Sequence, residues 1–297
     1  MRILLTGCYG MLGRELAQAL APLGTLAAYD RQGLNLASPD RIVACVREFR
    51  PHVIVNAAAW TEVDRAEEEE ALAHRVHAIA PGILAEEAAR LGARIVHYST
   101  DYVFDGTKPG PYEEADTPNP VNAYGRTKLA GERAVQAACA RHLIFRTSWL
   151  YASHGRNFLL TMLERLQRAG ELRIVDDQVG APTWSREVAT ATLRVLEDGM
   201  QDAGEPEPAG IFNVAASGST SWFDYASAIA ESLAAHDIDV RARRVPVTAA
   251  EYGSRTRRPP NSVFKLAKAE RLLNLESRPW QHSVNACVEE TLKRQRR

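Results

Sequence analysis

Short apolar runs alternate with amphipathic segments through the first half of this chain, and that alternation constrains the fold more than any other feature. The apolar runs cover residues 2–6, 25–29, 53–59, 94–99 and 142–147. The segments between them have apolar residues at helical spacing and cover 12–20, 39–49, 64–75, 80–91 and 124–140. Short apolar strands separated by helices indicate a parallel sheet covered on both faces, and right-handed crossovers make that sheet doubly wound. The sequence therefore predicts an α/β fold of the Rossmann type.

The second half of the chain is more mixed. It combines predicted helices at 156–168, 186–196 and 222–235 with predicted strands at 172–175, 211–215 and 240–246, and it ends in two helical segments. Residues 199–210 are rich in Pro, Gly, Asp and Glu and predict an exposed linker. We therefore predict a dinucleotide-binding domain over residues 1–150, to which later segments return, and a smaller, mixed α/β substrate lobe over 151–297.

Composition excludes several other classes of protein. The chain has 297 residues, of which 45% are apolar and 25% charged, as in an ordinary globular protein. Its net charge is −1, so it has no overall positive potential that would favour binding of a nucleic acid. No apolar stretch reaches the 18 residues that a membrane-spanning helix needs. The four cysteines lack C-x-x-C spacing and the histidines form no H-E-x-x-H motif, so no zinc site is predicted. These features are typical of a cytoplasmic protein with reduced thiols.

A glycine-rich loop joins the first predicted strand to the first helix. Gly7, Gly10 and Gly13 follow the strand at the G-x-x-G-x-x-G spacing, where glycine lets the backbone approach a pyrophosphate and a helix N-terminus offers free N–H groups. Asp30 ends the second strand, where an acidic residue accepts a hydrogen bond from the ribose 2′-hydroxyl of NAD. Arg31 beside it could instead pair the 2′-phosphate of NADP. The sequence is compatible with either NAD or NADP. A glycine-rich turn that only packs a helix against a strand, with no cofactor, is the alternative interpretation.

The third predicted strand ends in the small residues of 56–59, Asn-Ala-Ala-Ala. Small side chains there would let the ribose groups of a dinucleotide lie across the strand ends. Close packing of a helix on the sheet is the alternative explanation.

A second motif predicts the reacting groups. Tyr124 and Lys128 lie four residues apart and share one helix face, while Thr100 ends the fourth strand, at the sheet edge where ligands bind. Tyr124 would donate a proton to a carbonyl oxygen as hydride reaches its carbon, and Thr100 would hydrogen-bond the same oxygen. Lys128 would hold the nicotinamide ribose and lower the pKa of the phenol. A fall of that pKa from about 10 to about 7 takes roughly 4 kcal/mol, which one ammonium about 4 Å away supplies at a dielectric near 20.

These residues resemble the extended short-chain dehydrogenase/reductase family, and within it the branch that reduces dTDP-linked 4-keto sugars. The resemblance runs nearly end to end. It rests on the glycine loop and on NAAAWTEVDRAE (56–67), STDYVFDG (99–106), NAYGRTKLAGE (122–132), RTSWLY (146–151), DQVGAPT (177–183) and RRPPNS (257–262). STDYVFDG and DQVGAPT are specific to this branch, whereas Tyr-x-x-x-Lys is shared by the whole superfamily.

The resemblance implies reduction of the 4-keto group of dTDP-4-dehydro-L-rhamnose (dTDP-6-deoxy-L-lyxo-4-hexulose) by NADPH or NADH, giving dTDP-L-rhamnose. It implies that Tyr124, Lys128 and Thr100 are catalytic, and that Thr100, Asp101 and Trp149 contact the sugar nucleotide. Arg257, Arg258 and Asn261 would help to bind the diphosphate or the sugar, although ordinary surface charge also accounts for the arginines. The expected cofactor contacts are Gly7, Gly10, Met11, Leu12, Gly13, Asp30, Arg31, Asn35, Leu36, Ala59, Trp60, Thr61, Tyr124 and Lys128.

Some positions depart from the family pattern. Asn35 stands where the family often has an acidic residue before an apolar one, which bears on the adenine side of the cofactor. Some relatives form a homodimer through Mg²⁺ and interface carboxylates. Glu15 matches one such position and Glu187 lies near another, but together they make no complete ligand set, so no metal site is predicted. A homodimer is compatible with the sequence. The alternative functions are another nucleotide-sugar reductase or epimerase, and a non-catalytic, dinucleotide-binding regulatory subunit.

Overall fold

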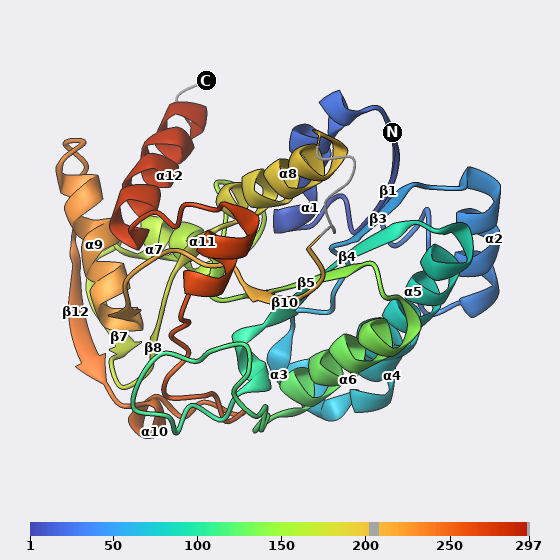
Figure 1. Ribbon diagram of the computed structural model, residues 1–297. Helices are drawn as coiled ribbons and strands as arrows, with labels where there is room; N and C mark the ends of the chain where they lie inside the picture. The colour runs from blue at the N-terminus through green and yellow to red at the C-terminus, as the bar shows by residue number, and fades with distance from the viewer. Residues whose placement is uncertain (202–207, 296–297) are drawn as a thin grey trace.

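The computed structural model describes residues 1–201 and 208–295 and has a six-stranded parallel sheet at its centre (Figure 1). The strand order is β10-β5-β4-β3-β1-β2, and every neighbouring pair is parallel. The strands are β1 (Arg2–Thr6), β2 (Thr25–Tyr29), β3 (Val53–Asn56), β4 (Arg94–Thr100), β5 (His142–Thr147) and β10 (Gly210–Asn213). The order reverses between β1 and β3, which is the switch point where a doubly wound sheet binds its ligand.

Helices cover both faces of this sheet, as the sequence predicts. One face carries α2 (Pro39–Phe49), α5 (Ala80–Leu91) and α6 (Ala123–Ala138), and the other carries α1 (Met11–Leu20) and α8 (Ser185–Gln201) (Figure 1). The strands between them are almost wholly apolar because both faces are buried. Ile54 and Ile95, for example, are fully buried toward α2 and α5, and Leu5 toward α1.

A second apolar cluster lies beyond the main sheet. It contains Tyr151, Tyr225 and Trp280 and joins α7 (Phe158–Arg165), α9 (Trp222–Ala234) and α12 (Trp280–Gln295). The parallel pair β7 (Gly170–Val175) and β12 (Ala242–Val247) flanks these helices at one side of the molecule (Figure 1). The remaining short elements are β6 (Leu150–Tyr151), β8 (Val179–Gly180), β9 (Thr183–Trp184), β11 (Thr220–Ser221), α10 (Ala249–Tyr252) and α11 (Ala267–Leu273).

We propose that this second cluster is the core of the substrate lobe. The chain enters it near residue 150, and later segments return to the main sheet, including α11, whose Ala269 and Leu273 join the apolar core beside α1 and α8. α8 packs on α1, and β10 pairs with β5 at the edge of the main sheet.

The helix predicted over 64–75 is broken into shorter pieces. The structure has α3 (Val63–Glu68), then α4 (Glu70–His74), then one π-helical turn, η2 (Arg75–Ile79), that runs into α5. Glu69 interrupts the first two with φ −124° and ψ 42°, outside the helical region. A π-turn inside a helix is uncommon and is frequently found at functional sites.

Several other boundaries also differ from the prediction, among them the ends of β3 and α8. β3 ends at Asn56 and not at residue 59, because the chain must leave the sheet to pass the glycine loop: a Cβ on Gly7 would lie 2.7 Å from the Ala58 backbone. α8 continues to Gln201, so the start of the predicted linker is helical, and residues 202–207 lie outside the described part of the chain. The two short 3-10 turns are η1 (Ala21–Leu23) and η3 (Asp101–Val103). Among the described residues, no helix has the length and apolar character needed to cross a bilayer.

Candidate active site

The predicted site residues converge at the carboxyl ends of β1, β3 and β4 and at the N-terminus of α6. Strand ends of a parallel sheet share one edge, so the glycine loop after β1, residues 57–61 after β3 and Thr100 at the end of β4 become neighbours. The substrate-lobe segment that carries Arg257 and Ser262 reaches the same edge, because Asn122 Nδ2 donates to the Arg257 carbonyl at 2.9 Å.

The glycine loop has the geometry of a pyrophosphate cradle. Gly7 adopts φ +77°, and its N–H donates to the Tyr29 carbonyl at 2.7 Å, which ties the loop to β2. A Cβ on Gly13 would lie 1.9 Å from the Gly7 carbonyl oxygen, so helix and loop pack too closely for any side chain. Gly10 begins α1 with no side-chain cap, which leaves the first N–H groups of the helix to a ligand. The loop therefore fits the dinucleotide that the sequence implies.

Asp30 and Arg31 follow β2, beside this cradle. Asp30 Oδ1 accepts from the N–H groups of Gln32 at 3.0 Å and Gly33 at 2.8 Å, while within the described residues Oδ2 accepts no bond. The carboxylate can therefore accept a ribose hydroxyl, and the exposed Arg31 lies where it could meet a phosphate. Asn35 closes a local turn by accepting from the Ala37 N–H at 3.0 Å. Leu36 is buried in the core beneath it.

The segment after β3 is held in place by a buried histidine. The Trp60 N–H donates to His77 Nε2 at 2.9 Å, and Arg65 lies over the Trp60 indole with its guanidinium carbon 4.7 Å from the ring centroid. Ala59 and Thr61 on either side are exposed. These three consecutive residues are thus placed at the sheet edge, as the cofactor prediction requires.

The N-terminus of α6 is capped by two side chains. Asn122 Oδ1 accepts from the Gly125 N–H at 2.8 Å, and Glu67 Oε1 accepts from the Ala123 N–H at 2.5 Å. Gly125 is required because a Cβ there would lie 2.1 Å from the Tyr102 carbonyl oxygen. This glycine, between the two motif residues, therefore sets how closely α6 approaches the end of β4, and with it the position of Tyr124.

Thr100 links Tyr124 to Asp101. The Thr100 hydroxyl donates to Asp101 Oδ1 at 2.9 Å and accepts from the Tyr102 N–H at 3.2 Å, and its interaction with Tyr124 opposes the rise in the phenol pKa that burial causes. Asp101 is buried and its Oδ2 has no hydrogen-bond partner among the described residues. Burial raises the pKa of Asp101 to about 6, against hydrogen bonds from Ser262 and Thr100 that lower it.

The expected effect of Lys128 on Tyr124 is wrong for this structure. The pKa of Tyr124 is raised, first by desolvation and then by the charge of Asp101, and Lys128 is not among the groups that shift it. Lys128 Nζ instead donates to the Tyr98 carbonyl at 2.5 Å. Burial lowers the pKa of Lys128 itself to about 8, and the carboxylate of Glu132 opposes that fall.

Glu132 belongs to a buried ion pair that anchors α6 to the sheet. Arg146 of β5 donates to it through Nε at 2.9 Å and Nη2 at 2.7 Å, and side-chain exposure is 2% for the arginine and 1% for the glutamate. The pair is bidentate, which fixes orientation as well as charge.

Trp149 of the predicted substrate set is held by two contacts. Its indole stacks on Trp222, with ring centroids 3.6 Å apart and planes within 5°. A Cβ on Gly180, in the DQVGAPT segment, would lie 2.4 Å from the indole, so only glycine leaves room for it. Trp149 also adopts φ +45°, an uncommon value for a bulky residue that marks a local constraint.

The segment 257–262 divides into exposed and engaged residues. Arg257 is exposed, and Arg258 is half-buried; burial raises the pKa of Tyr102, and the charge of Arg258 opposes that rise. Asn261 Nδ2 donates to the carbonyls of Lys108 at 2.8 Å and Gly110 at 2.9 Å, so this side chain shapes the loop that precedes α6. Its direct contact with substrate stays a prediction.

The carboxylates considered for Mg²⁺ have protein partners within this chain. Arg186 donates to Glu15 at 2.9 Å and also pairs with Glu290. Glu187 accepts from the Ser283 hydroxyl and lies apart from that pair. Within the described residues, no group of three His, Cys, Asp or Glu side chains could hold an ion.

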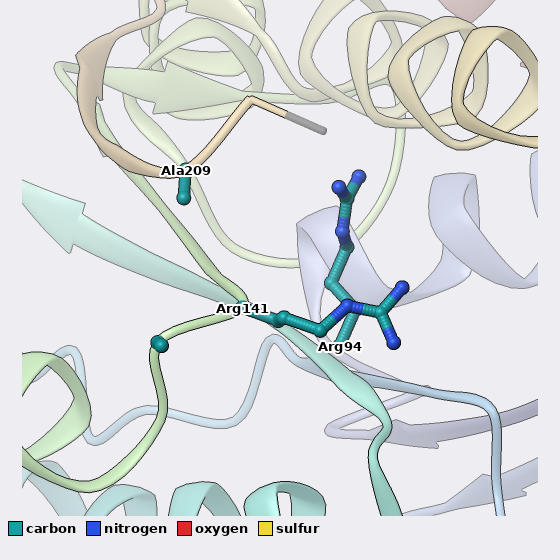
Figure 2. Close-up of a pocket in the computed structure, with 4 residues that line it drawn as sticks. Arg94, Arg141 and Ala209 are labelled. Atoms are coloured by element: carbon teal, nitrogen blue, oxygen red, sulfur yellow. The ribbon is translucent and has the colours of Figure 1, made fainter. Parts of the chain in front are cut away.

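A separate small cavity lies away from this site. Arg94, Ala140, Arg141 and Ala209 line it, and Figure 2 shows the side chains of Arg94 and Arg141 to the right of Ala209. Arg94 begins β4 whereas Thr100 ends it, so the two places lie about 20 Å apart along a strand of seven residues. The cavity therefore does not belong to the candidate active site.

Four residues that contact or electrostatically affect the predicted site residues escaped the sequence analysis: His77, Glu132, Arg146 and Trp222. Each acts through a partner far away in the chain, which no local pattern shows. Glu132 ends the motif NAYGRTKLAGE and Arg146 begins the motif RTSWLY. Their presence in these family motifs is the one sequence signal that could have identified them.

Fold and site together define an oxidoreductase of the extended short-chain dehydrogenase/reductase class. The sheet order, the glycine loop and a Tyr-x-x-x-Lys helix beside a strand-end threonine are the features that define it. Comparison with known proteins then narrows the class. The family model described as RmlD substrate binding domain matches residues 1–293, and the chain belongs to this family.

Curated and structural relatives agree with that membership. A dTDP-4-dehydrorhamnose reductase of Burkholderia thailandensis is 42% identical over 297 residues, which cover 98% of this chain and 99% of the relative. The crystal structure of a dTDP-4-dehydrorhamnose reductase from Clostridium acetobutylicum superimposes with a TM-score of 0.90 at 36% identity. The match covers 98% of this chain and 100% of that one. The crystal structure of a dTDP-4-dehydrorhamnose reductase from Bacillus anthracis in complex with NADP superimposes with a TM-score of 0.87 at 33% identity. The match covers 97% of this chain and 99% of that one. The chain is thus an NAD(P)H-dependent oxidoreductase.

Proposed function

We propose that this chain reduces the 4-keto group of dTDP-4-dehydro-L-rhamnose with NADPH or NADH to give dTDP-L-rhamnose. The observation that carries the proposal is the meeting of Thr100, Tyr124 and Lys128 at the carboxyl end of β4, beside an uncapped glycine-loop helix, in a chain of this family. The relatives named above are reductases of this substrate.

The glycine loop and the strand ends bind the cofactor, which when bound supplies the hydride. The N–H groups at the start of α1 hold its pyrophosphate, Asp30 accepts from a ribose hydroxyl, and Arg31 pairs a 2′-phosphate when one is present. Lys128 lies at the inner end of this site. Its ammonium, fixed by the Tyr98 carbonyl, holds the nicotinamide ribose.

Tyr124 donates the proton that the new hydroxyl needs. Its raised pKa keeps the phenol protonated at neutral pH, so it serves as an acid and not as a base. Thr100 lies beside the phenol and helps to orient it, and the Thr100 hydroxyl is itself held by Asp101. Thr100 and Asp101 then contact the sugar, and the Trp149 indole and the Arg257 and Arg258 guanidiniums hold the nucleotide end.

The test is oxidation of NADPH and of NADH with dTDP-4-dehydro-L-rhamnose, with the product sugar identified by NMR. Turnover to dTDP-L-rhamnose supports the proposal. A different product epimer would point to another nucleotide-sugar reductase, and cofactor binding without turnover would favour the regulatory subunit.

Two variants test the assigned roles in the same assay. Tyr124→Phe should keep cofactor affinity and lose about 10²–10⁴-fold in kcat, the usual range for a lost general acid. Lys128→Ala should weaken both cofactor binding and kcat. Full activity in Tyr124→Phe would remove the phenol from the mechanism.

Cellular location and assembly are part of the proposal. We expect the reaction in the cytoplasm, since all four cysteines are free thiols and disulfides are rare there. Light scattering on the active preparation tests the expected homodimer.

A further inference from the structure

His77 is a buried imidazole at the centre of the π-helical turn between α4 and α5. It is 0% exposed and lies between the segment after β3, which is assigned to the cofactor, and α6, which carries Tyr124. Nothing in the proposed chemistry uses it.

The hydrogen bonds of His77 have a fixed direction. Nε2 accepts from the Trp60 N–H at 2.9 Å, so the ring hydrogen is on Nδ1 and donates to Thr127 Oγ1 at 2.9 Å. The Thr127 hydroxyl in turn donates to the carbonyls of Ala123 at 2.8 Å and Tyr124 at 3.0 Å. A continuous chain of bonds therefore runs from the Trp60 backbone to the backbone of Tyr124.

His77 also touches the Tyr124 ring directly. The two rings meet edge to face with centroids 5.4 Å apart, and Tyr102 makes a second such contact at 5.7 Å. The phenol is thus held between two perpendicular rings. Burial, with the nearby charge of Lys128, lowers the pKa of His77 to about 3, so the ring stays neutral and keeps its one donor and one acceptor.

The π-turn explains how this residue reaches two elements at once. The wider π-helical turn rotates the side chains that follow it, compared with a continuous α-helix. Gly131 of α6 leaves room for the backbone of this turn. A Cβ on Gly131 would lie 1.9 Å from the His77 carbonyl oxygen, so the turn and α6 are in backbone contact.

We propose that His77 is a positioning residue that fixes the distance between the cofactor segment at Trp60 and the phenol of Tyr124. It carries no proton in the reaction. The inference rests on the proposed function for the role of Tyr124, but its link to Trp60 concerns cofactor binding alone.

Two variants remove the bond chain in different ways. His77→Phe keeps a ring of similar size against Tyr124 and removes both hydrogen bonds. Thr127→Val keeps the shape of the threonine and removes one of them, and it serves if His77→Phe does not fold. Thr127→Ser keeps the hydroxyl and should restore wild-type behaviour.

The expected result is a loss of kcat with a smaller loss of cofactor affinity. A misplaced phenol should lower kcat by about 10- to 100-fold in His77→Phe. Loss of the bond to Trp60 should weaken NADPH binding, measured by fluorescence, by about fivefold. The double variant should lose little more than His77→Phe, because both changes break one chain.

The control is Val135→Ala, which opens a buried site in the last turns of α6, away from the reacting groups. It should lower Tm without changing kcat or KM. If His77→Phe affects kinetics no more than this control does, His77 is a core residue and the proposal fails. The proposal also fails if His77→Phe removes an ionisation from the pH profile of kcat, since that would show proton transfer.

The two proposals can fail separately. If the wild-type chain binds NADPH without reducing the sugar, the proposed function fails, and the fivefold change in NADPH affinity still decides the role of His77. If Tyr124→Phe keeps full activity while His77→Phe loses it, positioning of Tyr124 is the wrong explanation.

Discussion

Breaking the buried pair between Arg146 and Glu132 should destabilise the fold strongly and asymmetrically. The two groups join β5 to α6, one helical turn beyond Lys128, with bonds of 2.7 and 2.9 Å and almost no exposure. Removing one partner leaves the other charge buried without compensation. Replacing both removes two desolvation penalties together with the attraction.

The size of the effect follows from burial and chain length. Loss of one partner of a buried pair costs about 3–5 kcal/mol. Unfolding entropy is about 2 cal/mol/K per residue, or roughly 0.6 kcal/mol/K for a chain of this length, so Tm should fall by about 5–8 °C. Glu132→Met and Arg146→Met should each show this loss, and the double variant should lose less than either.

Thermal and denaturant unfolding of the three variants measure these losses. The exposed pair of Arg168 and Glu164, with 70% and 64% side-chain exposure, gives the control, and Glu164→Gln should change stability by less than about 0.5 kcal/mol. The reasoning is refuted if a single buried variant loses less than about 1 kcal/mol, or if the double variant loses the sum of the two.

The other predictions concern the site and its surroundings. Asp101 has a folded pKa of about 6, above its unfolded value near 3.9, so its stability contribution is present below about pH 4 and is lost as the pH rises through about 6. Asp101→Asn should therefore stabilise the fold more at about pH 8 than at about pH 4, and the difference in the free energy of unfolding should be on the order of 3 kcal/mol. Calorimetry at the two pH values measures it, and an equal change in Tm at both would contradict the prediction. Gly180→Ala should push the Trp149 indole aside and raise the KM for the sugar nucleotide by about tenfold with NADPH affinity unchanged; a change in NADPH affinity alone would speak against the substrate role. EDTA and Mg²⁺ should leave the wild-type Tm unchanged, because Arg186 serves as the cation for Glu15 and Glu290. Arg186→Gln should lower stability by about 1–2 kcal/mol and make Tm sensitive to Mg²⁺, and a wild-type response to EDTA would overturn this interpretation.

Local pattern was sufficient for the elements whose ends carry local signals. The predicted bounds of β2, α2 and β5 match the structure. α2, for instance, begins with Pro39 at its first position and ends where Arg50 takes the left-handed conformation, with φ 51°. β3 is shorter than predicted because the glycine loop, about fifty residues earlier in the chain, packs against its end. The spacing of apolar residues along a strand or helix does not report a contact with a segment so distant in the sequence.

The π-turn at His77 shows the same limit in the site. Its bonds join residues 17 and 50 positions away, and the predicted helices over 64–75 and 80–91 leave residue 77 between them. Motif order did predict that Thr100, Tyr124 and Lys128 would meet, because strand ends and the following helix share one edge of a parallel sheet. It could not predict the direction of the Lys128 ammonium, and for that reason the expected pKa of Tyr124 was wrong.

Lys128 shows why the surrounding structure must be rigid. Its folded pKa of about 8 lies below the unfolded value near 10.4, so between these values the unfolded chain binds more protons and the fold gains stability as the pH rises. At neutral pH the fold therefore holds an ammonium against a desolvation cost, and that ammonium is the form that can hold a ribose. The carboxylate of Glu132 lowers this cost and is itself held by Arg146, which reaches α6 from β5. We propose that the ion pair acts on the site through Lys128, as His77 acts through Tyr124, and the contacts of both fix the position of α6.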